Sequence, residues 1–552
     1  MRPWRPSCIQ GALLAMLVGS LAGCSGKAEI GEELAGGSRA GTREGREALF
    51  DQILGMTEKR EAFSPLKEEA MGYSPLDDMR GLRSEVVDAE TEADLYYALV
   101  KLSNARRDHH LTVTPAEAGL RPPQVPDVAA PIRVLPDYSN LKTPSFFVAA
   151  VGGEDGTGAP RPTPGDLIVA VNGRPILEYV ETFTPWVVHS SIHGLYWDIA
   201  RDLPLRRANV PPSLYEETLS LELERPSGER YMVALPYIDQ AEMDVPQAEE
   251  PLYPGFTTVM ERLNFNVLLP EDGRPLVLLQ WFDFEYELIQ DVIDLMEFAE
   301  REGLLEHKLV IDVTDSGGGS RGAYAIQRLV DRPFRTTFGN IRLSDAGEEF
   351  IRRWSEADDD GDAPEIFGLN ESGSWLHEWA RTDASEALAR GDEYTEPVAF
   401  KLAHLPKDAD GILQPAPVHF SGPIAILSGP RGGSHLDQFV AMFADNDLAY
   451  IVGMPTGGYS NTWEAEETLH FPGTEQPVVR FMWNVGHTLR PNGEILEGNP
   501  PMPDTYISLT RENFRTYHQI LLEAALAELD TDNGAVTSKV SHAERVSNVY
   551  SN

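Results

Sequence analysis

A serine that directly follows two glycines has the residue type and setting for nucleophilic chemistry. Ser434 comes after Gly432 and Gly433, and the apolar run at residues 423–427 before them is short enough to be a buried strand. An amphipathic segment begins at Asp437. A serine at such a strand-to-helix turn can expose its hydroxyl beside a free backbone N–H, as a nucleophile requires. The alternative is a helix N-cap, because serine is a favoured cap and Asp437 resembles the distal member of a capping box.

A second glycine-rich loop could supply the anion-binding groups that such a nucleophile needs. The β-branched run at residues 309–313 leads into Thr-Asp-Ser and then Gly317, Gly318 and Gly319. Glycines after a strand let the backbone approach a ligand closely and turn several N–H groups toward it. The loop therefore predicts an anion cradle.

Four blocks of the C-terminal half resemble the serine peptidases of the C-terminal processing and tricorn family. Residues 312–319 resemble the family pattern D-L-R-x-N-x-G-G, and residues 433–437 resemble its nucleophile segment. Residues 445–458 resemble D-N-x-R-A-x-I-V-G-x-x-T-x-G, with Leu448 in place of the family arginine. Residues 497–504 resemble E-G-x-G-V-x-P-D. The resemblance implies that Ser434 attacks peptide bonds and forms an acyl-enzyme without a cofactor. Its implied partners are peptide or protein substrates.

The general base distinguishes two branches of that family. The C-terminal processing branch uses a lysine 25 residues after the serine, and this position holds Tyr459. A phenol with a pKa of ~10 is a poor base near neutral pH. The tricorn-like branch takes a histidine from an upstream D-x-H motif, and residues 108–110 read Asp-His-His. The resemblance therefore implies His110 as the base, with His109 as the alternative.

The resemblance also implies a residue that orients the base. Glu497 would hold the imidazole of His110 and stabilise its charged form, and Glu494 is the alternative. A metal at the histidines would need further ligands, and the neighbouring sequence supplies no good set. We therefore expect no metal.

Two backbone N–H groups complete the implied site. The oxyanion would lie between the N–H of Gly318 or Gly319 and the N–H of His435. His435 takes part in this scheme only through its main chain, so we expect no role for its side chain.

The elements that position these residues can be predicted from the spacing of apolar residues. A capping box at residues 91–94 precedes a helix with buried Leu95, Leu99 and Leu102, and this helix ends just before the D-x-H motif. Further on, strand-like residues 276–279, a helix at 289–299 and the strand at 309–313 form a βαβ unit, which implies a largely parallel sheet.

Residues 165–176 alternate in polarity and contain Asn-Gly, which predicts a β-hairpin, and residues 219–235 predict another. The first resembles the G-D-x-I-x-x-V-N-G signature of PDZ domains, which bind peptides at a sheet edge. We expect this module to feed substrate to the site and to perform no chemistry.

Together these features predict a multidomain α/β fold. Its parts are an N-terminal helical region at residues 46–125, a PDZ-like β module at 131–240 and a crotonase-like βαβ catalytic core at 255–530. We expect a flexible tether at 25–45 and a disordered tail at 531–552.

The charge and the cysteine content of the chain limit the kinds of partner and cross-link that it can have. The 552-residue chain has a formal net charge of −41 and no Lys/Arg-rich block, which disfavours nucleic acid and anionic membrane surfaces. Its two cysteines, Cys8 and Cys24, are too few and too close to the N-terminus for a disulfide framework. The sequence carries no signal for the oligomeric state.

The N-terminus predicts a lipoprotein signal peptide at residues 1–24. Arg2 and Arg5 precede a short apolar run at residues 9–21, and residues 21–24 read Leu-Ala-Gly-Cys, which resembles a bacterial lipobox. Cys24 would carry the lipid and anchor the protein in the bacterial cell envelope, at the outer membrane in a Gram-negative host.

Two other functions fit the same scaffold. Because Tyr459 replaces the family lysine, the chain could be a catalytically silent relative that binds peptides or other ligands. A different acyl-transfer or crotonase-like enzyme could use the same backbone cradle.

Overall fold

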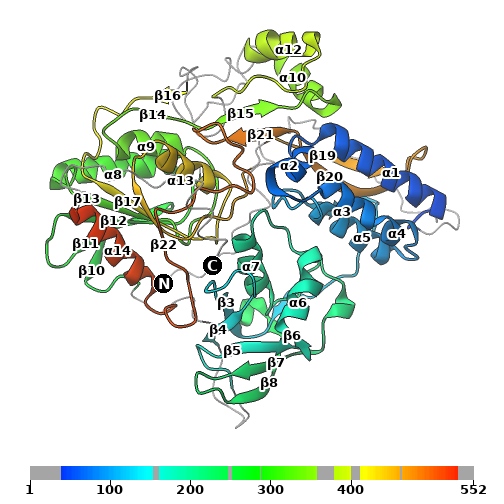
Figure 1. The fold of residues 1–552 in the computed structure, drawn as a ribbon, viewed down its shortest axis with the longest axis horizontal. Coiled ribbons are helices and arrows are strands. Elements are labelled where there is room, and N and C mark those ends of the chain that lie inside the picture. Colours follow the sequence, from blue (N-terminus) through cyan, green and yellow to red (C-terminus); the bar gives the residue numbers. More distant parts are fainter. Residues whose placement is uncertain are drawn as a thin grey trace, which may run out of the picture.

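The computed structural model describes residues 39–152, 161–245, 252–285, 287–356, 378–399, 411–460 and 463–531. The predicted signal peptide and lipobox, and nearly all of the predicted tail, lie outside these residues. Figure 1 shows N-terminal helices, a β-rich module and a larger sheet grouped around a common centre. Among the described residues, no helix combines the length and apolarity needed to span a membrane.

The N-terminal region is helical, as predicted. Helix α5 (Glu92–Asn104) starts with the predicted capping box, in which the Thr91 hydroxyl accepts from the Asp94 N–H at 3.1 Å and the Asp94 carboxylate accepts from the Thr91 N–H at 3.0 Å. The leucines of its apolar stripe are fully buried. The other helices are α1 (Arg43–Arg60), α2 (Lys67–Met71), α3 (Pro75–Gly81) and α4 (Arg83–Val87). Helix α1 starts inside the segment expected to be a tether.

A hairpin from the C-terminal half completes this helical region. Strand β20 (Pro477–Asn484) pairs with β1 (Val113–Pro115) on one side and with β19 (Glu464–His470) on the other. Phe481 and Trp483 of β20 are fully buried in the same hydrophobic core as Leu99 of α5. The N-terminal helices therefore bury their apolar faces partly against the other end of the chain.

The β-rich module is an antiparallel sheet with the order β3-β4-β5-β7-β8. Asn172 and Gly173, with φ of 49° and 76°, form the predicted two-residue turn between β5 and β6. Strands β7 and β8 form the second predicted hairpin, and α7 packs on β3. The elements are β2 (Val128–Ala129), β3 (Ile132–Pro136), β4 (Phe146–Val151), β5 (Leu167–Val171), β6 (Arg174–Pro175), α6 (Ile176–Phe183), α7 (Ile192–Asp202), β7 (Thr218–Glu224), β8 (Arg230–Pro236) and β9 (Ile238–Asp239).

The larger sheet has seven strands in the order β10-β11-β12-β13-β17-β18-β22. The five strands from β12 to β22 are parallel, and β10 and β11 add an antiparallel edge. The predicted βαβ unit is β12–α8–β13. The strands are β10 (Phe256–Glu261), β11 (Phe265–Pro270), β12 (Leu276–Trp281), β13 (Lys308–Asp312), β17 (Ile424–Ser428), β18 (Tyr450–Gly453) and β22 (Thr505–Tyr506).

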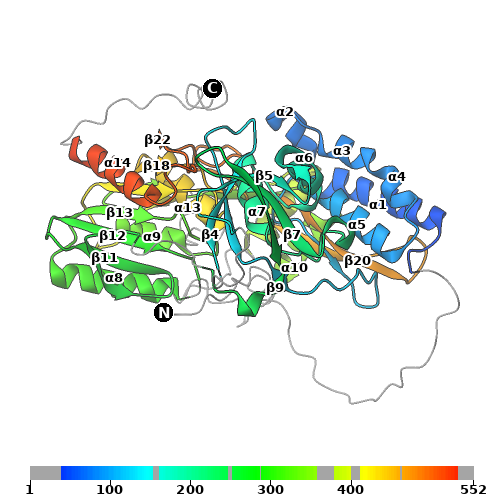
Figure 2. The same cartoon turned by 90° about the horizontal axis from the view of Figure 1, so that it is seen from below.

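Both faces of this sheet are covered, because alternate residues of each buried strand point to opposite sides. Helices α8 (Leu288–Glu302), α9 (Gly322–Leu329) and α13 (His435–Asp445) share one hydrophobic core with Val277, Leu279 and Ile311. Leu278, Val310 and Leu427 belong to the other core, where α14 (Tyr517–Thr531) packs. Figure 2 shows α8 and α14 on opposite sides of the strands.

The remaining elements lie between α9 and β17 and near the C-terminal end. They are β14 (Phe334–Arg335), β15 (Phe338–Ile341), α10 (Asp345–Glu356), α12 (Ser385–Arg390), β16 (Ile412–Leu413) and β21 (Gly486–Leu489). The prediction of a multidomain α/β fold with a largely parallel sheet is confirmed.

Candidate active site

The predicted nucleophile and the predicted anion cradle start from the same edge of the larger sheet. Strands β13 and β17 are parallel neighbours, with Asp312 opposite Leu427. The carboxyl ends of parallel strands carry the loops that bind ligands in open α/β sheets. The glycine loop after β13 and the turn after β17 therefore meet.

Ser434 occupies the position before helix α13 but does not cap it. Its side chain makes no capping hydrogen bond, and its backbone has φ of 62° and ψ of −122°, which a residue with a Cβ rarely adopts. Ser434 is partly exposed, while Gly433 and His435 on either side are buried. A strained turn that presents a serine hydroxyl is the arrangement expected of a nucleophile, so the N-cap alternative does not describe this residue.

Gly318 lies directly against Ser434. A Cβ added at Gly318 would lie 2.8 Å from the Ser434 Cβ and 3.3 Å from its Oγ, so only glycine fits. The loop is fixed from behind by Phe284, whose N–H donates to the Gly318 carbonyl at 3.1 Å and whose carbonyl accepts from the Ser320 N–H at 3.0 Å. Within the described part of the chain, no protein acceptor is recorded for the N–H of Gly318, of Gly319 or of His435. These three N–H groups are the predicted oxyanion donors.

Tyr459, in the position of the family lysine, contacts the nucleophile turn, which is the turn that carries Ser434. Its carbonyl accepts a hydrogen bond from the Ser434 N–H. Its ring lies beside Gly433, where an added Cβ would come within 2.6 Å of it. Burial raises the pKa of the phenol further above its ordinary value of 10.0, which makes a proton-accepting phenolate unavailable near neutral pH.

Asp437, in the first turn of α13, ties the same turn to the loop before Tyr459. One carboxylate oxygen accepts from the Thr456 hydroxyl and, at 3.0 Å, from the Gly458 N–H. The carboxyl is fully buried, and burial raises its pKa to about 7. The apparent capping-box residue therefore acts as a tertiary link.

The structure brings His110, Asp108 and Glu497 together. One nitrogen or oxygen from each of the three side chains lies within 4.8 Å of the others. The backbone N–H of His110 donates to the Asp108 carboxylate at 3.1 Å, and this hydrogen bond stabilises the turn after α5. The aromatic ring of His110 lies 5.4 Å from that of Tyr459, edge to face, so the cluster adjoins the nucleophile turn.

Glu497 is 1 % exposed and reaches the nucleophile turn through Ser460. The Ser460 N–H donates to Glu497 at 2.7 Å, and the Ser460 hydroxyl donates to the Ser434 carbonyl at 3.3 Å. Burial, and then the nearby Asp108 carboxylate, hold the pKa of Glu497 well above its ordinary value. Its alternative, Glu494, is half exposed and accepts from the side chains of Asn492 and Asn499.

His109 has different neighbours from His110. Its ring stacks on Tyr459, and its Nε2 lies 3.4 Å from a carboxylate oxygen of Asp198. Asp198 is held in turn by Arg201 at 2.7 Å. Geometry therefore favours His110, and not His109, as the partner of Glu497.

Lys67 is a member of this cluster that sequence reasoning missed. It is 1 % exposed, and its ammonium donates to the carbonyls of Arg106 and Arg107, each at 2.8 Å. Arg107 has φ of 50°, so the clamped turn is strained. Burial lowers the pKa of Lys67, and the carboxylates of Asp108 and Glu497 act in the opposite direction. A lysine isolated from any recognisable pattern gives no sequence signal for such a position.

The β-rich module forms part of the wall of this site. The Ser190 hydroxyl accepts from the backbone N–H of His109 at 2.9 Å, and it lies close enough to Glu497 to act against the rise in the pKa of that carboxyl. The Ser191 hydroxyl, at the start of α7, donates to the Gly457 carbonyl at 2.8 Å. The module thus contacts the candidate catalytic residues directly, which a module that only feeds substrate would not require.

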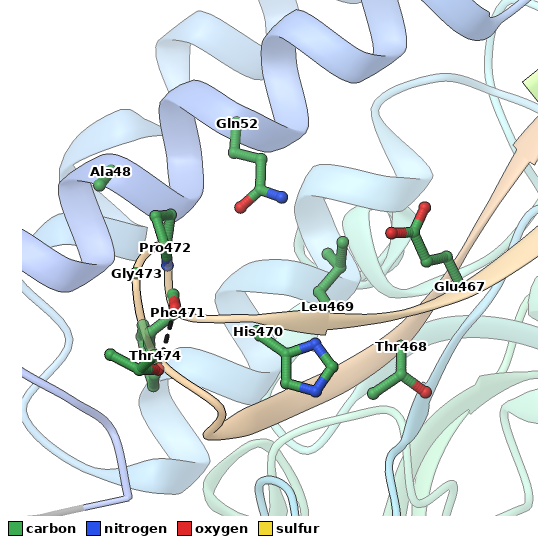
Figure 3. A pocket seen from close by; sticks show the side chains of 10 residues that line it. All are labelled: Ala48, Gln52, Glu467, Thr468, Leu469, His470, Phe471, Pro472, Gly473 and Thr474. Carbon is green, nitrogen blue, oxygen red and sulfur yellow. Dashed lines mark hydrogen bonds between the residues drawn. The ribbon is translucent and has the colours of Figure 1, made fainter. Parts of the chain in front are cut away.

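A separate surface pocket of about 410 Å³ lies between α1 and the turn that joins β19 to β20 (Figure 3). Its lining includes Gln52, His470 and Phe471, and it contains none of the predicted site residues. The chemistry predicted from the sequence is therefore not placed in this pocket.

No protein-family model and no curated protein matches the sequence. Among solved structures, mature CPAF has a similar fold, with a TM-score of 0.67 and 16% identity over 90% of this chain and 99% of that chain. Mature CPAF complexed with lactacystin gives a TM-score of 0.67 and 16% identity over 89% and 99% of the two chains. The tricorn protease also matches, but its TM-score of 0.35 is too low to support an argument.

A photosystem II D1 C-terminal processing protease also matches, with a TM-score of 0.38, which is likewise too low to support an argument. The predicted resemblance to serine peptidases of the C-terminal processing and tricorn family is confirmed at the level of the fold. The likeness to mature CPAF shows the fold, and the serine-type peptidase activity stays a prediction.

Proposed function

We propose that this protein is a serine endopeptidase of the tricorn-like kind that hydrolyses peptide bonds through an acyl-enzyme. Ser434 is the nucleophile, His110 the general base, and Glu497 the residue that orients and stabilises the charged imidazole. The oxyanion site is formed by the N–H of Gly318 or Gly319 and the N–H of His435.

In the first half-reaction, the Ser434 Oγ attacks the peptide carbonyl carbon while His110 takes the hydroxyl proton. The negative oxygen of the tetrahedral intermediate accepts from the backbone donors. His110 then returns its proton to the leaving amine, and the C–N bond breaks to give an ester on Ser434. In the second half-reaction, a water molecule attacks the ester carbonyl while His110 takes a proton from it. His110 then returns the proton to the Ser434 oxygen, the ester bond breaks, and the carboxylic acid is released.

The observation that carries this proposal is the setting of Ser434. Ser434 is partly exposed on a turn with φ of 62° and lies against a glycine loop, and the N–H groups of Gly318 and Gly319 have no acceptor among the described residues. Strain of this kind is retained where the surrounding structure enforces it, and such positions cluster at functional sites. His110 and Glu497 reach the same turn through Tyr459 and Ser460.

Two finer assignments belong to the same proposal. We assign the β-rich module as PDZ-like, with peptide segments as its ligands, and the larger sheet with its helices as a crotonase-like core. We also retain the lipid anchor at Cys24, which would place the peptidase in the bacterial cell envelope.

The test is covalent labelling combined with peptide hydrolysis. The purified wild-type chain should react with a fluorophosphonate probe at Ser434 and cleave an unfolded protein such as casein. Lactacystin, with which one CPAF structure is complexed, should compete with the probe for the same site. Ser434→Ala and His110→Ala should each lower turnover on the order of 10⁴-fold or more, and the double variant should be no worse than either single variant.

Ser227→Ala, in a surface turn, and His419→Ala serve as matched controls and should behave as wild type. A wild-type chain that neither labels nor cleaves would favour the silent, ligand-binding alternative. Labelling without hydrolysis of any peptide would favour a different acyl transfer.

A further inference from the structure

The side chain of His435 connects the two halves of the proposed oxyanion site. Its Nε2 accepts a hydrogen bond from the Gly322 N–H at 2.7 Å, at the start of α9. Its ring also packs edge to face on Phe284, with the ring centroids 5.2 Å apart. Phe284 holds the Gly318 carbonyl and the Ser320 N–H with its own backbone. The imidazole therefore contacts both supports of the glycine loop, one at each end.

The imidazole is suited to a fixed structural contact. His435 is fully buried, and burial lowers its pKa to about 3, so the ring is neutral at any working pH. Because Nε2 accepts from an N–H, the ring proton is on Nδ1. An added Cβ at Gly322 would come within 2.6 Å of Nε2, so the ring and the loop are in close contact. Arg321, just before Gly322, has φ of 72°, which shows that the loop end is strained.

We propose that His435 is a positioning residue for the oxyanion site: its main chain supplies one donor, and its side chain fixes the loop that carries the other. The inference rests on the proposed peptidase function. It reverses the expectation that the His435 side chain has no role. Since the transition state is sensitive to the distance between the two donors, the effect falls on kcat and not on substrate binding.

Two substitutions test this role. His435→Leu fills the space with an apolar side chain and leaves the Gly322 N–H without its acceptor. His435→Gln offers an amide oxygen near the place of Nε2. His487→Leu is the matched control, because His487 is also a buried histidine and packs against Phe63 and Tyr394.

We expect His435→Leu to lower kcat by 10- to 1000-fold, on the order of the loss of one oxyanion donor, with KM changed by less than about 3-fold. Affinity for a peptide aldehyde, whose hemiacetal occupies the oxyanion site, should fall in parallel with kcat. His435→Gln should recover most of both quantities. Amide hydrogen exchange in residues 315–323 should accelerate in His435→Leu and stay at the wild-type rate in His487→Leu.

The outcomes separate this inference from the proposed function. If wild type is active and His435→Leu matches it in kcat, aldehyde affinity and exchange, the inference is wrong and the peptidase function stands. If His435→Leu and His487→Leu lose activity equally, in proportion to their thermal stability, His435 is merely a core residue. If wild type neither labels nor cleaves, the proposed peptidase function is wrong. In that case, amide hydrogen exchange at the wild-type rate in residues 315–323 of His435→Leu would show that the side chain does not fix the glycine loop either.

Discussion

Tyr459 lies flat against His109, with ring centroids 4.0 Å apart and ring planes inclined by 17°. Its ring also lies beside Gly433, at the nucleophile turn. The residue in the position of the family lysine is therefore a spacer between the turn that carries Ser434 and the loop that carries the histidines. This relationship explains how a tyrosine can occupy the position without supplying a base.

Tyr459→Phe should keep at least half of the wild-type kcat for peptide hydrolysis, because the ring and its packing remain and only the hydroxyl is lost. Tyr459→Ala should lower kcat at least 10-fold, because both the turn and the histidine loop lose their packing partner. Steady-state kinetics on one peptide substrate measure both variants. A large loss in Tyr459→Phe would mean that the hydroxyl takes part in the chemistry.

Lys67→Met should impair the placement of His110. The substitution keeps the length and apolar volume of the side chain but leaves two carbonyls without a donor, at a cost of about 1–3 kcal/mol each. We expect kcat to fall at least 10-fold and the thermal midpoint to drop. Lys101→Met is the control, because the Lys101 ammonium pairs with the half-exposed Glu85 at 2.8 Å and lies 4.8 Å from the centre of the Trp186 ring, and it holds neither carbonyl of the turn. Wild-type turnover in Lys67→Met would show that the turn after α5 holds its shape unaided.

Asp437 should make stability depend on pH. Its pKa is about 7 in the folded chain and 3.8 ordinarily, so between these values the folded state keeps a proton that the unfolded state has released. This contribution favours folding most at low pH and is lost as pH rises through about 7. Asp437→Asn removes it, so the free energy of unfolding of the variant relative to wild type should rise by about 3 kcal/mol from pH 5 to pH 8.

Urea denaturation at the two pH values measures this difference. Asp77→Asn, at a largely exposed carboxylate paired with Arg80, is the control for the loss of a carboxylate elsewhere in the chain. A constant difference between Asp437→Asn and wild type would contradict the raised pKa.

Cys24→Ala should release the protein from the membrane fraction of its bacterial host. The expectation rests on the lipobox-like residues 21–24 and the short apolar run before them. Metabolic labelling with palmitate and fractionation check it, with Cys8→Ala as the control that should stay labelled and membrane-bound. Equal labelling of Cys24→Ala and wild type would exclude this lipidation site.

The sequence predicted the elements whose signals are local. The capping box at Thr91, the Asn-Gly turn at Asn172 and the βαβ unit around α8 each depend on neighbouring residues, and the structure contains all three. The meeting of the Ser434 turn with the Gly318 loop was also predictable, because parallel strands end at one edge.

What the sequence did not predict depends on contacts between distant segments. Lys67, Ser190 and Ser460 acquire their roles only because three regions of the chain converge, and none carries a spacing signal. The pairing of β1 with β20 is of the same kind. The contacts of the His435 side chain are also of this kind, because Gly322 and Phe284 are distant from it in the sequence.

The convergence of these regions also affects when the site comes into existence during folding. His110 and Ser434 are separated by more than three hundred positions, and the pairing of β1 with β20 links the regions that hold them. Contacts of such sequence separation form late, after the loop-closure entropy has been overcome. A chain that is still being synthesised therefore has no assembled site, and the proposed peptidase could act only after its last elements have docked.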